Sequence, residues 1–108
     1  MTAGTYACAV EDVPLGEGRA ITLGDRRIAI FRATGGWYAL DAACPHRGGP
    51  LADGIVCDGA VICPLHDRRF DLASGTGLNT EDTVVAHGVE VHEEQVFVTL
   101  AAAQPVAA

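Results

Sequence analysis

The chain has 108 residues, and 14 Asp and Glu against 7 Lys and Arg give it a formal net charge of −7. A domain of this length can bury a core, and its acidic surface would repel phosphate backbones, which excludes nucleic acid as a favoured partner. The sequence contains no N-terminal export signal and no run of about 18 apolar residues that could cross a membrane. We therefore expect a single cytoplasmic domain that binds neither nucleic acid nor membrane.

The first 41 residues consist of short runs of alternating polarity separated by Gly, Asp and Pro. This pattern is typical of an all-β sandwich or barrel. It predicts a first strand at residues 5–10 and a hairpin made of 19–23 and 27–33. A Thr-Gly-Gly turn then leads to a strand at 37–41.

The periodicity ends at residue 41, where AACPHRGGPLADG has too many Gly and Pro residues for a long regular element. The run IVCDGAVIC then indicates two short strands around an Asp58-Gly59 turn, followed by a second irregular turn, CPLHDRR. After a brief strand, FDL, we expect closing strands at 83–87, 89–92 and 95–100. Residues 101–108 are expected to be a disordered tail, and no helix is predicted.

Each of the two irregular turns carries one Cys and one His. Cys44 and His46 are separated by one residue, Cys63 and His66 by two, and sixteen residues lie between the two pairs. Buried thiols, a closed zinc site and a thiol enzyme are alternatives, but zinc modules usually pair Cys with Cys and His with His, and a thiol enzyme needs only one activated Cys. The duplicated Cys-His pairs favour a 2Fe-2S centre with mixed ligation, because a Rieske centre has two His in place of two Cys on one iron.

From about residue 6 to residue 100, the sequence closely resembles the Rieske family. The resemblance implies a small antiparallel β-sandwich in a single domain, residues 1–100, with a cluster-binding subdomain at about 42–72. Carried over position by position, Cys44 and Cys63 would hold the buried iron of a Rieske-type 2Fe-2S cluster. His46 and His66 would hold the outer iron.

Four positions depart from the high-potential members of that family. Gly49 and Leu65 stand where those proteins have a pair of cysteines that form a disulfide across the cluster. Asp67 and Arg68 follow His66, where those proteins have Gly and a Ser that donates a hydrogen bond to a sulfide. Fewer donors and an added negative charge favour the oxidised cluster, so we expect a reduction potential near the low end of the Rieske range, about −150 mV or somewhat above.

Within the family, the runs CPHRGGPLADGIV and CPLHDRRFDLASGTGL look most like the small subunit of assimilatory NAD(P)H-dependent nitrite reductase. That resemblance implies a non-catalytic electron-transfer subunit whose partner is a flavin- and sirohaem-containing large subunit that reduces nitrite to ammonium. The alternative is a Rieske-type ferredoxin that takes electrons from a ferredoxin reductase and supplies them to an aromatic-ring-hydroxylating dioxygenase. Such ferredoxins more often have His-Gly in the second turn, where this chain has His66-Asp67.

Several reactive side chains remain outside this ligand set. Cys8 and Cys57 are expected to be free thiols with a structural role, with a disulfide between them as the alternative. His87 and His92 are expected to be surface imidazoles on an acidic pair of strands. Three arginines flank the ligating histidines and are expected to be either solvated charges or docking contacts for an acidic partner: Arg47, Arg68 and Arg69.

Overall fold

The computed structural model describes residues 4–44, 50–65 and 67–101, and almost all of the regular structure in them is β-strand. Within these ranges, no helix is long and apolar enough to cross a membrane. The elements, in chain order, are β1 (Thr5–Ala9), the 3-10 helix η1 (Val10–Asp12), β2 (Gly18–Leu23), β3 (Arg26–Ala33), β4 (Gly36–Asp41), the 3-10 helix η2 (Leu51–Asp53), β5 (Ile55–Cys57), β6 (Ala60–Ile62), β7 (Arg69–Asp71), β8 (Ala86–His92) and β9 (Gln95–Thr99). The all-β prediction is confirmed.

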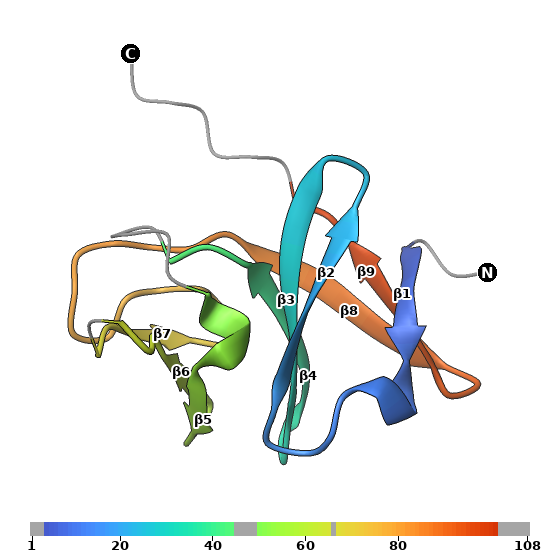
Figure 1. Cartoon of the computed structure of the whole chain (residues 1–108), viewed down its shortest axis with the longest axis horizontal. Helices are drawn as coiled ribbons and strands as arrows, with labels where there is room; N and C mark the ends of the chain where they lie inside the picture. Colours follow the sequence, from blue (N-terminus) through green and yellow to red (C-terminus); the bar gives the residue numbers. More distant parts are fainter. Residues whose placement is uncertain (1–3, 45–49, 66, 102–108) are drawn as a thin grey trace.

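The described strands form a six-stranded sheet in the order β1-β9-β8-β4-β3-β2 and a three-stranded sheet in the order β5-β6-β7 (Figure 1). All the strand pairs are antiparallel. Strand β8 changes its partner along its length, because Ala86 and His87 pair with β4 and the residues from Gly88 onward pair with β9. This strand therefore connects the β2-β3-β4 half of the larger sheet to the β1-β9 half.

Strand β3 is buried on both faces. Ile28 and Ile30 belong to a core cluster shared with β1, β4 and β9. Ala29 and Phe31 belong to a second cluster, which contains residues of the small sheet and of η2. Because successive side chains of a strand point to opposite faces, one continuous apolar run, Ile-Ala-Ile-Phe, supplies two separate cores. The small sheet is thus packed against the outer face of β3 and β4.

The segment that leads from β7 to β8 is held against the small sheet by backbone hydrogen bonds. This segment passes round the end of the molecule that carries β5, β6 and β7 (Figure 1). Its backbone is held by hydrogen bonds between Val84 N–H and Gly75 O, at 2.9 Å, and between Leu78 N–H and Arg69 O, at 2.8 Å. Gly75 has φ 77°, and a Cβ atom there would collide with the carbonyl oxygen of Val84, so glycine is required at this crossing.

Two closing strands predicted from the sequence are a single strand in the structure. The expected break between 83–87 and 89–92 fell at Gly88, but Gly88 pairs with Thr99 and continues β8. The strand begins at Ala86; Asp41 N–H still donates to Val85 O in the register of β4, but Val84 N–H donates to Gly75 O on another segment. Gly88 therefore interrupts the sequence pattern without interrupting the strand.

The turn between β8 and β9 holds two non-glycine residues in the left-handed region of the backbone. Glu93 and Glu94 form the two-residue connection with φ 52° and 64°, whereas the equivalent turn between β5 and β6 has Asp58 and Gly59. A left-handed conformation costs a non-glycine residue about 1 kcal/mol or more, so Glu94→Gly should raise the free energy of unfolding by about 1 kcal/mol. The urea midpoint of the cluster-loaded protein measures this. Gly59→Glu is the matched control and should lower the midpoint; a Glu94→Gly midpoint at or below that of the parent would contradict the prediction.

Candidate metal centre

The first irregular turn leaves the end of β4 and returns to η2. Its base is closed on both sides, because Leu51 N–H donates to Ala42 O at 3.0 Å and Ala43 forms a β-bridge with Pro50. Cys44 lies just inside this closed base and is only 2% exposed. His46, the second predicted ligand on this turn, lies outside the described residues, so its role stays a prediction.

The second irregular turn connects β6 to β7 and is closed in the same way. Cys63 follows the last residue of β6, and its N–H donates to Arg68 O at 2.7 Å. Asp67 N–H donates to Cys63 O at 3.2 Å, and Asp67 has a left-handed φ of 52°. Cys63 is completely buried. His66 lies outside the described residues.

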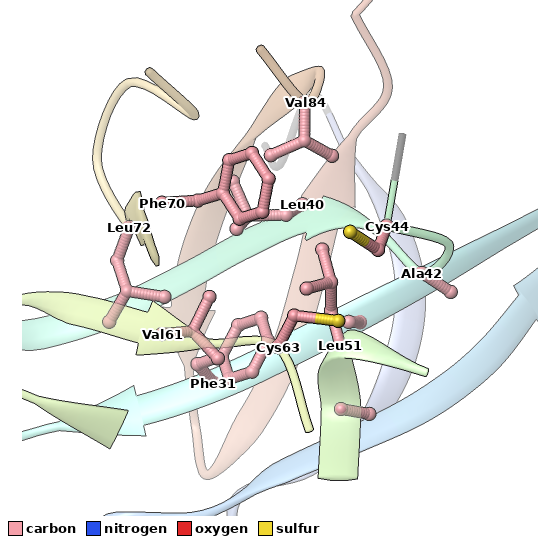
Figure 2. Close-up of a cluster of buried hydrophobic side chains, with 12 residues drawn as sticks. Phe31, Leu40, Ala42, Cys44, Leu51, Val61, Cys63, Phe70, Leu72 and Val84 are labelled. Carbon is pink, nitrogen blue, oxygen red and sulfur yellow. The ribbon is translucent and has the colours of Figure 1, made fainter. Parts of the chain in front are cut away.

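The two cysteines meet in one buried cluster, although they come from turns on different sheets. Figure 2 shows both sulfur atoms at the same end of this cluster, near Leu51. The other members are apolar, so water is excluded from this side of both thiols: Ala29, Phe31, Leu40, Ala42, Leu51, Ala52, Val61, Phe70, Leu72 and Val84. The structure thus brings together the two cysteines that the sequence predicts as ligands.

The other two cysteines lie elsewhere. Cys8 is buried in the cluster between the halves of the larger sheet, and Cys57 is exposed at the end of β5; both are free thiols, as predicted. Burial raises the pKa of the Cys8 thiol above its ordinary value, and the Asp12 carboxylate raises it further. A thiol held protonated in this way is a poor metal ligand and a poor nucleophile.

The prediction that His87 is a surface imidazole is wrong. Its side chain is fully buried, and its Nε2 lies 2.8 Å from Oδ1 of Asp41. Ala101 N–H donates to Nδ1 at 2.9 Å, so the neutral ring carries its proton on Nε2 and donates it to Asp41. Arg26 closes a ring of hydrogen bonds, because its two Nη atoms bond Asp41 Oδ1 and Ala101 O.

This ring fixes the point from which the first turn departs. Asp41 ends β4 and lies three residues before Cys44, so a fixed Asp41 restricts where Cys44 can be placed. It also attaches Ala101, the first residue of the expected tail, to the sheet; residues 102–108 lie outside the described residues. The exposed His92 contacts Glu90 at 3.0 Å, in agreement with the surface position predicted for it.

Sequence reasoning missed Asn79, whose side chain holds the second turn. Its Nδ2 donates to Asp67 O at 2.9 Å, and its Oδ1 accepts from Arg69 N–H at 2.8 Å. Asn79 therefore spans the residues directly before and after Arg68. No sequence signal could have found it, because both of its partners are backbone groups that any residue would provide.

The donor set fits an iron-sulfur group. Cysteine thiolate is the ligand that such clusters require, and two cysteine sulfurs from separate turns share one water-excluded cluster. The site also contains a buried donor, Arg68 Nε–H, with no hydrogen-bond partner among the described residues. A group that carries acceptor sulfur atoms would supply such a partner.

Comparisons with known proteins agree with this chemistry. The model of the protein family described as "Rieske [2Fe-2S] domain" matches residues 4–93 of this chain. The 3-phenylpropionate/cinnamic acid dioxygenase ferredoxin subunit of Shigella boydii serotype 4 (strain Sb227) is 36% identical over 103 residues, which are 93% of this chain and 96% of that protein. The solved nitrite reductase [NAD(P)H] small subunit from Erwinia carotovora is 25% identical, with a TM-score of 0.79 over 100% of this chain and 89% of that one. A chain from the complex of reduced oxygenase and oxidized ferredoxin in carbazole 1,9a-dioxygenase is 26% identical, with a TM-score of 0.79 over 87% of this chain and 99% of that one.

The contacts of Asn79 predict a local effect on the second turn. Asn79→Ala removes both hydrogen bonds, so the free energy of unfolding should fall by about 1–2 kcal/mol and the Arg69 amide should exchange its hydrogen faster. Asn79→Asp keeps the acceptor for Arg69 N–H but loses the donor to Asp67 O, so it should leave Arg69 protected. Hydrogen exchange at Arg69 measures both effects, with the exposed neighbour variant Leu78→Ala as control. Equal protection in Asn79→Ala and Leu78→Ala would exclude this role.

Proposed function

The chain belongs to the Rieske [2Fe-2S] family, and we propose that within it this chain is a ferredoxin that supplies electrons to an aromatic-ring-hydroxylating dioxygenase. Membership implies a Rieske-type 2Fe-2S cluster and makes the chain an electron-transfer protein. The cluster, when bound, accepts and releases one electron at a time.

We assign Cys44 and Cys63 to one iron and His46 and His66 to the other. The observation that carries this assignment is the pair of buried cysteine sulfurs in one apolar cluster, each on a turn closed by backbone hydrogen bonds. The apolar walls exclude water from the thiolates, and the closed turns fix their spacing before the cluster binds. In the sequence, each histidine follows its cysteine by two or three residues, so both histidines belong to the turns whose bases these hydrogen bonds close.

Full-length similarity supports the oxygenase role. The 36% identity to a dioxygenase ferredoxin subunit extends over nearly the whole of both chains, whereas among the solved structures the chain from the carbazole 1,9a-dioxygenase complex and the nitrite reductase small subunit are equally similar, at 26% and 25%. On this assignment, the partners are a ferredoxin reductase that loads the electron and an oxygenase that receives it. The chain is a carrier, and the oxygenation takes place on its partner.

A nitrite reductase small subunit is the second candidate, which the sequence alone favours. It is supported by the Gly48-Gly49-Pro50-Leu51 run after His46 and by the solved Erwinia carotovora subunit, whose fold covers the entire chain. This role implies a lasting complex with a large subunit that contains flavin and sirohaem. A dioxygenase ferredoxin would instead bind its reductase and its oxygenase in turn, in transient complexes.

The ligand assignment predicts which cysteines the cluster needs. Cys44→Ser and Cys63→Ser should each abolish the visible absorbance and the EPR signal of the purified protein, because thiolate ligation is lost. Cys57→Ser is the matched control, since Cys57 is exposed at the edge of the same small sheet and should leave both signals intact. Iron and sulfide content per chain gives the measurement. A Cys63→Ser protein with parental iron content and EPR spectrum would refute the assignment.

The two partner hypotheses differ in how long the complex lasts. We predict that the reduced chain is reoxidised within seconds by the oxygenase component of a ring-hydroxylating dioxygenase from its host, and that it separates from this component on gel filtration. Stopped-flow absorbance follows the reoxidation, and the large nitrite reductase subunit of the same host is the comparison. A stoichiometric complex with the flavin and sirohaem subunit, with electron transfer to it and none to the oxygenase, would replace the first candidate by the second.

A further inference from the structure

Arg68 carries a buried hydrogen-bond donor that nothing in the described residues satisfies. The Nε atom is inaccessible to solvent and has no acceptor there, although the residue as a whole is only half-buried. Buried donors in folded proteins almost always have a partner, and an unsatisfied donor on a charged group is especially costly. An acceptor for Arg68 is therefore to be expected in the functional protein.

The register of the small sheet shows where that acceptor must be. Val61 is paired with Phe70 and Ile62 with Arg69, and the hydrogen bond from Cys63 N–H to Arg68 O extends this register by one pair. Residues directly opposite in an antiparallel pair place their side chains on the same face, with Cβ atoms about 5 Å apart. The side chain of Arg68 thus starts beside that of Cys63.

The solvent exposure of residues 67–70 also indicates that the Arg68 side chain points toward the cluster of Cys44 and Cys63. Along the chain, Asp67 and Arg69 are exposed, Arg68 is half-buried and Phe70 is fully buried. This alternation puts Arg68 on the face of Phe70, which packs in the cluster that contains Cys44 and Cys63 (Figure 2). The members of that cluster are aliphatic, aromatic or cysteine side chains, so none offers a carboxylate or an amide oxygen to the guanidinium.

We propose that Arg68 donates its Nε–H to a sulfur atom of the bound 2Fe-2S cluster and thereby raises the reduction potential. The inference rests on the proposed ligand assignment, in which Cys63 holds one of the irons. The residue occupies the second position after His66, so the chain supplies an arginine donor where a serine donor is absent. This is a tuning role, and Arg68 is not itself a ligand.

The direction of the effect follows from charge. Reduction adds one electron to the cluster, and both a cation and an N–H donor stabilise the added negative charge. The apolar surroundings reduce screening, so the interaction is stronger than it would be at the surface. Arg68 opposes the effect of the exposed Asp67 carboxylate, which disfavours reduction but is better screened by solvent.

The experiment compares two neighbouring arginines in the cluster-loaded full chain. Arg68→Met and Arg69→Met remove the same charge, but Arg69 is exposed, whereas Arg68 is half-buried with its Nε atom inaccessible to solvent. Spectroelectrochemical titration should show a fall in midpoint potential for Arg68→Met that is at least three times the fall for Arg69→Met. Resonance Raman spectra should show shifted Fe–S stretching bands in Arg68→Met and parental bands in Arg69→Met. Equal potential shifts, or unchanged bands in both variants, would overturn the proposal.

A second variant separates the hydrogen bond from the charge and from folding. Arg68→Lys keeps the charge but lacks the planar Nε–H, so its potential should lie between those of the parent and Arg68→Met. Loss of the cluster from both Arg68 variants, with iron retained in Arg69→Met, would make Arg68 a structural residue and overturn its tuning role. Because Cys63→Ser tests the ligands by iron content, failure of the ligand assignment is distinguishable from failure of this inference.

Discussion

Everything at the candidate centre depends on the burial of β3 on both faces. Phe31 belongs to the cluster that encloses Cys44 and Cys63, while Ile30, the next residue, belongs to the core between the halves of the larger sheet. Burial of each such side chain contributes about 2 kcal/mol, so the large sheet and the small sheet stabilise each other through β3 together with the neighbouring β4. The described part of the cluster-binding region is consequently an extension of the core.

Backbone hydrogen bonds fix the bases of the two turns. The bond of Leu51 N–H to Ala42 O and the bridge of Ala43 to Pro50 close the first turn, and the bond of Cys63 N–H to Arg68 O closes the second. Two side chains hold the ends of these turns. Asp41, in its ring of hydrogen bonds, fixes the start of the first turn, and Asn79 binds the backbone of the second. A metal centre that must change charge without moving benefits from such preorganised turns, because little has to rearrange around the added electron.

The local parts of this architecture could be predicted from the sequence, and the long-range parts could not. Alternating runs and the Asp58-Gly59 turn located most strands to within a few residues, and the two Cys-His pairs picked out the two cysteines that the structure brings into one cluster. The expected surface position of His87 was wrong because its partners, Asp41 and Ala101, are 46 and 14 residues away. Asn79 could not be predicted from the sequence for the same reason. A side chain that bonds a distant backbone group leaves no periodic trace in the sequence.

The same burial that protects the thiol sulfurs makes the centre sensitive to single charges. In an apolar surrounding, a cation or a donor acts on a neighbouring group with little screening, whereas the same group at the surface has a small effect. Asp67 and Arg68 are adjacent in the chain and opposite in charge, yet one is exposed and the other has its Nε buried. Their effects on the cluster therefore do not cancel. Which residue faces inward, set by the period of two along an extended segment, decides the direction in which the potential moves.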